Sequence, residues 1–127
     1  MGYTVITNQK ESKNNKIKFY YWYYLEIMTL DNEFVKQTNK LVSETLKLYQ
    51  DAGASPRIGE VWRCENTGDF LCGFFVGEMV GSALSAFQVF HRREPTPQEH
   101  MEIVEIVESY SEEITEFFSQ FNSWSYI

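Results

Sequence analysis

The sequence is poor in residues that form covalent or metal cross-links. Its 127 residues include two cysteines, Cys64 and Cys72, and two histidines, His91 and His100. Zinc sites need cysteines and histidines in closely spaced pairs, and neither spacing here provides one. We therefore expect no metal and no cofactor. Two thiols without a secretory signal favour a reducing compartment, which predicts a cytoplasmic location.

Basic residues are also scarce, and they are unevenly placed. The net charge is −7, and residues 1–50 contain seven lysines and no arginine, whereas residues 51–127 contain four arginines and no lysine. Because phosphate groups are bound by cationic surfaces, this acidic balance argues against nucleic acid and anionic membranes as partners. The change of basic residue type indicates two compositional blocks, or chance combined with an acidic last helix.

Apolar residues are abundant enough for one compact domain, at 43% of the chain with 17% aromatic. Residues 7–16 are polar and predict a flexible leader, and the aromatic run at 17–27 favours a strand. We assign 1–27 to a leader with this aromatic strand and 28–127 to a single domain. Its first helix is expected between an Asp31 N-cap and a C-terminal turn at Gly53.

The middle of the chain predicts strand, helix and strand. A short strand is expected at 58–64, followed by a turn and a helix from Asp69 on. Gly73, Gly77 and Gly81 recur at four-residue steps, so they share one helical face on which another backbone can approach closely. Glu78 and the short length between polar turns argue against a membrane span. Alternation over 82–91 then predicts a second extended segment.

One long helix is expected at the end of the chain, over 96–121. Thr96, Pro97 and Glu99 match a capping box with proline in the first turn. The resulting strand–helix alternation predicts an α/β fold, with a small three-stranded parallel or mixed sheet packed with three helices. The alternative is an all-α bundle in which 66–91 forms one long helix.

Cys72 and His91 are the candidate catalytic residues. Cys72 lies in the first turn of the expected middle helix, where unpaired backbone N–H groups favour a thiolate. In a parallel strand–helix–strand unit, the start of the helix and the end of the next strand share one sheet edge. His91 would then meet Cys72 as its general base. The alternative for Cys72 is a buried, inert core thiol.

The segment 61–72 resembles the nucleophile signature of the pyroglutamyl peptidase I family of cysteine peptidases. The matching positions are Val61, Cys64, Asn66, Thr67, Gly68, Phe70, Leu71 and Cys72, and "AFQVFH" is similar to the segment that carries the family's histidine. The resemblance implies part of a doubly wound peptidase fold, Cys72 as nucleophile, His91 as base, and removal of N-terminal pyroglutamate from peptides without a cofactor. An inactive relative would keep the same pair.

A function of another class is also open. The glutamate-rich last helix, the surplus of aromatic residues and the small size fit a non-enzymatic acidic protein-binding module, of inhibitor or immunity type, or a homodimerising domain. The expected partner is a peptide substrate or a protein. An open three-stranded sheet would leave an exposed edge, which favours self-association.

Overall fold

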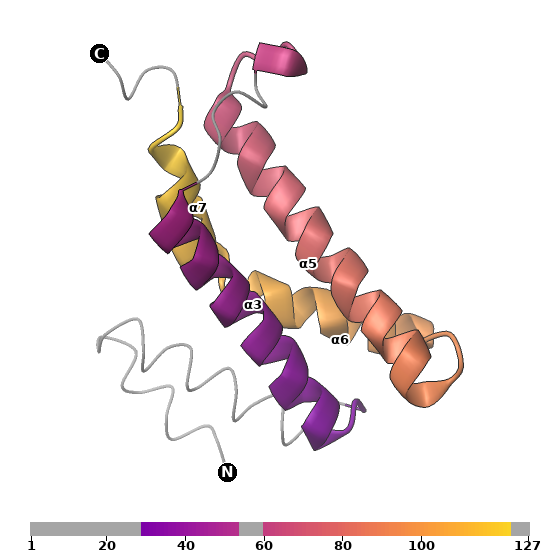
Figure 1. Ribbon diagram of the computed structural model, residues 1–127. Helices are drawn as coiled ribbons and strands as arrows, with labels where there is room; N and C mark the ends of the chain where they lie inside the picture. Colours follow the sequence, from indigo (N-terminus) through magenta and orange to yellow (C-terminus); the bar gives the residue numbers. More distant parts are fainter. Residues whose placement is uncertain (1–28, 54–59, 123–127) are drawn as a thin grey trace, which may run out of the picture.

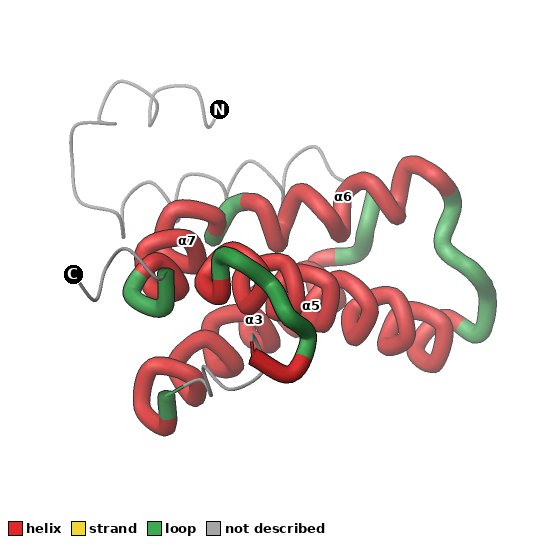
Figure 2. The backbone as a smooth tube through the Cα atoms, turned by 90° about the horizontal axis from the view of Figure 1, so that it is seen from above, coloured by secondary structure: helices red, strands yellow, loops and turns green. Residues whose placement is uncertain are grey.

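The computed structural model describes residues 29–53 and 60–122, and these residues form helices joined by short turns (Figure 1). The helices are α3 (Asn32–Ala52), α5 (Thr67–His91), α6 (Pro97–Glu108) and α7 (Ser111–Ser119). Figure 2 shows α6 and α7 lying over the pair formed by α3 and α5. α6 contacts both α3 and α5, and α7 contacts α5.

The predicted α/β fold is wrong, because the described residues contain no strand. The alternative, an all-α bundle with 66–91 as one helix, agrees with the structure. Residues 82–91 continue α5 instead of turning extended, since Phe75, Met79, Ala83 and Phe87 recur every four residues and are all buried. That helical period outweighs the local alternation of apolar residues near position 89.

The two other predicted strands fare differently. In the segment predicted as a strand at 58–64, Glu60 and Val61 are helical and lead into a turn, while positions 58 and 59 lie outside the described residues. The predicted strand at 17–27, like the rest of the leader, also lies outside them. The proposed division of the chain at residue 27 therefore stays a prediction.

Helix α3 begins and ends where the sequence predicts. The Asp31 side chain accepts a hydrogen bond from the Phe34 amide at 3.0 Å, as an N-cap does. At the other end Gly53 has φ 80° and donates its N–H to the Tyr49 carbonyl at 2.7 Å. Glycine takes this backbone conformation without a steric cost, which lets the chain leave the helix there.

The predicted final helix over 96–121 is instead two helices, α6 and α7, with a break at Ser109 and Tyr110. The Thr96–Glu99 capping box and the early Pro97 are confirmed. At the break, the Ser109 hydroxyl donates to the Ile106 carbonyl at 2.6 Å, which competes with regular helical bonding. Buried Tyr110 donates to the Asn39 side chain of α3 at 2.7 Å and fixes the direction of the turn.

The core lies between α5 and the other three helices. Phe75 of α5 packs edge-on against Tyr49 of α3, with ring centroids 5.2 Å apart, and lies tilted against Phe118 of α7, with centroids 5.5 Å apart. Burial of such aromatic and aliphatic side chains is the main source of stability. The fully buried large side chains are Val35, Val42, Phe75, Met79, Phe87, Ile103, Ile106, Val107, Ile114 and Phe118.

Candidate functional site

Cys72 lies in the second turn of α5, half-buried on the side that faces α7. Burial raises the pKa of its thiol, while a hydrogen bond with Thr115 of α7 acts in the opposite direction and the nearby charge of Asp69 adds to the rise. Cys72 is not in a disulfide. A raised pKa means little thiolate at neutral pH, so the surroundings of Cys72 are those of a packed thiol and not of an activated nucleophile.

His91 is the last residue of the same helix, so the structure does not bring the two candidate catalytic residues together. Nineteen residues of helix rise about 28 Å, whereas a thiol and its general base must be within hydrogen-bond reach. The crossover that was expected to join them would require a strand over 82–91, which is helical here. The thiol–imidazole contact needed by the peptidase hypothesis is therefore missing from the described part of the chain.

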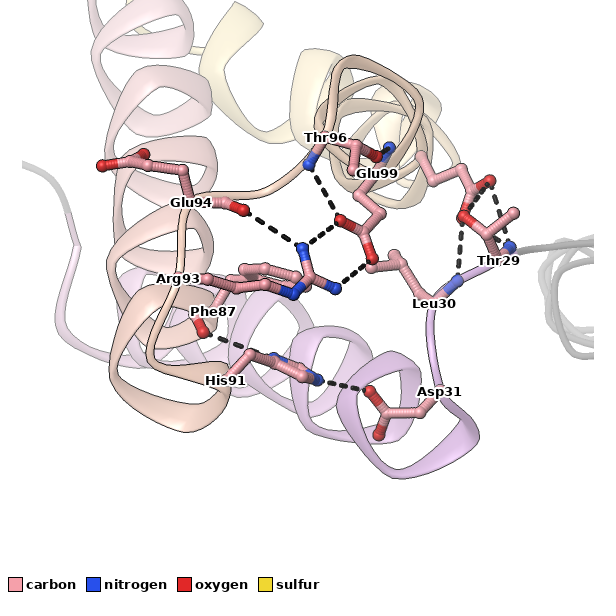
Figure 3. A network of polar contacts seen from close by, with 10 residues as sticks. Thr29, Leu30, Asp31, Phe87, His91, Arg93, Glu94, Thr96 and Glu99 are labelled. Atoms are coloured by element: carbon pink, nitrogen blue, oxygen red, sulfur yellow. Dashed lines mark hydrogen bonds and ion pairs between the residues drawn. The ribbon is translucent and has the colours of Figure 1, made fainter.

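The partner of His91 is Asp31, the N-cap of α3, which lies 60 residues earlier in the sequence. Nε2 of His91 is 2.8 Å from Oδ1 of Asp31, and Nδ1 is 3.3 Å from the Phe87 carbonyl oxygen (Figure 3). The ring also stacks on Phe87, with centroids 4.1 Å apart. From the sequence Asp31 could be predicted only as a helix cap, because nothing local in the sequence indicates which residue the other carboxylate oxygen will meet.

Arg93 and Glu99 form a second polar pair beside His91. Arg93 donates to both oxygens of Glu99, at 2.8 and 2.9 Å, and its guanidinium carbon lies 4.9 Å from the centre of the Phe87 ring (Figure 3). The hydrogen bond from Arg93, aided by the Thr96 amide and by the charge of Arg93, lowers the pKa of Glu99 to about 2. This pair fixes the loop between α5 and α6.

Glu102 of α6 anchors the residues just before α3. Its carboxylate accepts from the Thr29 amide at 2.9 Å, from the Leu30 amide at 3.1 Å and from Gln98 at 2.8 Å. Burial acts to raise the pKa of Glu102, but these hydrogen bonds outweigh it, so the pKa is lowered. Glu102 is buried, and its carboxylate holds the backbone at the start of α3.

No group of three or more potential metal ligands occurs among residues 29–53 and 60–122. The side chains of Asp31, His91, Glu99 and Glu102 at this end of the bundle are instead engaged in hydrogen bonds and ion pairs within the chain. They hold α3, α5 and α6 together, and their arrangement is that of a structural junction.

The outer face of α5 is the most unusual surface of the described chain. Asp69 and Glu78 are the only acidic residues in this helix, and it contains no lysine or arginine. By length and composition alone α5 could cross a membrane, a test that core helices of soluble proteins also pass, yet only 28% of its apolar window is buried. A helix that is apolar all round normally is buried all round.

The stripe of glycines lies on this outer face. No described atom comes within 4 Å of a Cβ built at Gly73, Gly77 or Gly81, so no backbone in the described part of the chain approaches them closely. The predicted close approach is therefore absent from the described chain itself. Phe74, which is 51% exposed, lies three residues before Gly77 and seven before Gly81, on the same side of the helix. We use the term α5 outer face for the surface made by Phe70, Gly73, Phe74, Gly77 and Gly81.

Comparisons with known proteins add no relative: no protein-family model, no curated protein and no solved structure matches this chain. Function must therefore be argued from the residues themselves. The resemblance to pyroglutamyl peptidases stays a prediction, carried by the sequence motif alone.

Proposed function

We propose that this protein is a non-enzymatic helical module that pairs with a second copy of itself through the α5 outer face. The observation that carries the proposal is an apolar helix that residues 29–53 and 60–122 pack on one side only. In a symmetric dimer the other side of α5 would also be buried, by the same helix of the partner. α5 would then be a central helix of the assembly, which accounts for its composition.

The three glycines support a close helix–helix contact. Glycine in a helix interior costs about 0.8–1.0 kcal/mol relative to alanine. Nothing in the described protomer requires a missing side chain at Gly73, Gly77 or Gly81, since each faces open space. A second helix lying against the stripe would gain from their absence, because small residues let two backbones approach closely.

Charge favours the same face. The chain carries a net charge of −7, so two copies repel each other over most orientations. The α5 outer face consists of glycine and phenylalanine, and the exposed Asp69 and Glu78 lie at its border. Glu78 accepts a hydrogen bond from Tyr49, so contact at this face brings few like charges together. It also removes exposed apolar surface, including that of Phe74, from water.

The size of the face predicts a weak dimer. A 25-residue helix is about 37 Å long, and a contact strip about 10 Å wide along it covers on the order of 400 Å² per copy. Stable interfaces bury about 1,200–2,000 Å² in total, so we expect association in the micromolar range or weaker. Such a module would respond to its own concentration, or to tethering within a larger assembly.

Sedimentation equilibrium between about 1 and 300 μM tests the proposal. We expect the mass to rise from that of one 15.0 kDa chain toward twice that value. Gly77→Leu should abolish the rise, because the added side chain keeps the helices apart, and Phe74→Ser should weaken it. The matched control is Ser82→Leu, an exposed position of α5 that five residues rotate well away from Gly77.

The result that would contradict the proposal is a monomer at all concentrations, or equal effects of Gly77→Leu and Ser82→Leu. Co-sedimentation with neutral lipid vesicles forms the second arm of the experiment. Vesicle binding by a monomeric chain would assign the α5 outer face to a membrane surface instead. Binding lost in Phe74→Ser would locate it to that face.

A further inference from the structure

His91 lies with both ring nitrogens facing oxygen atoms. Nδ1 is 3.3 Å from the Phe87 carbonyl oxygen and Nε2 is 2.8 Å from Oδ1 of Asp31. Neither oxygen can donate a hydrogen bond, because one belongs to a backbone carbonyl and the other to a carboxylate. Only the imidazolium form, which carries a proton on each nitrogen, donates to both.

A neutral ring fits this position less well in either tautomer. With the proton on Nε2, the lone pair of Nδ1 faces the Phe87 carbonyl; with the proton on Nδ1, the lone pair of Nε2 faces the Asp31 carboxylate. Rotation of the ring is opposed by its packing, since it stacks on Phe87 and meets Phe34 edge-on at 5.7 Å. Loss of one proton therefore leaves one unfavourable contact in place.

The charged groups near His91 come from α3, from the end of α5, from the loop that follows it and from α6. Asp31 at the start of α3 is the nearest ionised group, and the C-terminal end of α5 adds the negative end of the helix dipole. From the loop, Arg92 and Arg93 oppose a further positive charge and Glu94 favours it. Arg93 is neutralised by Glu99, and Glu102 of α6 is engaged with Thr29 and Leu30.

We propose that His91 is a proton-dependent clasp between the end of α5 and the start of α3. The protonated ring holds Asp31, and through it the first turn of α3, because the other oxygen of the same carboxylate caps the Phe34 amide. Loss of the ring proton weakens the clasp and loosens this end of the bundle. The inference is independent of the proposed dimer.

Urea unfolding at pH 5.5 and pH 8.0 tests the clasp in the full chain. The pKa of Asp31 is lowered despite its partial burial, by hydrogen bonds from Phe34 and His91 and by the charge of His91, so Asp31 is ionised at both pH values. We expect the folding equilibrium constant of the natural chain, divided by that of His91→Gln, to be about three- to tenfold larger at pH 5.5 than at pH 8.0. Asp31→Asn keeps the N-cap and removes the charge. The folding equilibrium constant of the natural chain divided by that of Asp31→Asn should therefore also be larger at pH 5.5 than at pH 8.0.

His100 supplies the matched control, because the chain has only two histidines and His100 is exposed on α6. The ratio for His100→Gln should be the same at both pH values. A ratio for His91→Gln that does not change with pH overturns the inference. Nitrogen NMR of the natural chain gives a second readout that needs no variant: a His91 ring with a single proton at pH 5.5 also overturns it.

Discussion

The Arg93 guanidinium donates two hydrogen bonds, 2.8 and 2.9 Å long, to the Glu99 carboxylate, and Glu99 in turn caps the first turn of α6. Both oxygens of Glu99 are thus used by the loop that joins α5 to α6. Glutamine at this position would keep the cap to the Thr96 amide and lose the ion pair. Glu99→Gln therefore tests the ion pair separately from the helix cap.

We expect Glu99→Gln to lower the free energy of unfolding at pH 7 by on the order of 1–2 kcal/mol. This change is smaller than the free energy that corresponds to the full pKa shift of Glu99. The reason is that the Arg93 side chain is 48% exposed, so solvent screens the ion pair. Since the pKa of Glu99 is lowered from 4.5 to about 2, its contribution is complete above pH 4.5 and is lost as the pH falls toward 2. Urea titrations at pH 7 and pH 2.5 measure both effects.

The control for Glu99 is Glu108→Gln, on an exposed position of the same helix. It removes the same charge and should change stability by less than about 0.5 kcal/mol. If the two variants are equally stable at pH 7, the ion pair contributes nothing measurable and this prediction is wrong.

Gly68 is the glycine that the protomer itself requires. A Cβ at this position would lie 2.5 Å from the Phe118 carbonyl oxygen and would also overlap the Asn122 side chain. Because the carbonyl belongs to the backbone of α7 and cannot move aside, Gly68→Ala should destabilise the fold by about 1–3 kcal/mol. Gly73→Ala, on the open side of α5, should instead stabilise it by up to about 1 kcal/mol.

Thermal unfolding of both glycine variants, at a concentration low enough to keep the chain monomeric, tests this prediction. The unfolding temperature should fall for Gly68→Ala and rise for Gly73→Ala. A Gly68→Ala chain as stable as the natural one would mean that α5 and α7 are not as closely packed at this point as described.

Arg92 holds a backbone conformation that favours glycine. It follows α5 with φ 55° and ψ 39°, and its N–H donates to the Gln88 carbonyl at 2.8 Å. A side chain in this left-handed region costs about 1–2 kcal/mol, so Arg92→Gly should raise the free energy of unfolding by about 1 kcal/mol. The control is Arg92→Ala, which removes the same charge but keeps the backbone strain. Its midpoint of thermal unfolding, measured by calorimetry, should be no higher than that of the natural chain.

Cys72 should react slowly. Because burial raises the pKa of its thiol, alkylation by iodoacetamide at pH 7.5 should be slower than that of free N-acetylcysteine. The measurement is made in a Cys64→Ser background, so that one thiol is followed. Alkylation faster than that of N-acetylcysteine would support the peptidase hypothesis. So would release of a fluorophore from a pyroglutamyl amide, if Cys72→Ala abolishes that release.

The sequence by itself determined both ends of α3 and the start of α6. Asp31, Gly53, Thr96 and Glu99 act through bonds to atoms three or four residues away, and such bonds form whatever the rest of the chain does. The apolar stripe of α3 is local in the same sense. These features could be predicted because their physical causes lie within one or two helical turns.

Only the tertiary structure decided the fold class and the fate of the candidate site. Residues 82–91 suit a strand or a helix locally, and burial of Phe75, Met79, Ala83 and Phe87 against three other helices selects the helix. Because 82–91 is helical, Cys72 and His91 lie at opposite ends of α5, and the His91 ring contacts the carboxylate of Asp31, 60 residues earlier in the sequence. Contacts of such sequence separation depend on how whole helices pack, and no local pattern of residues encodes them.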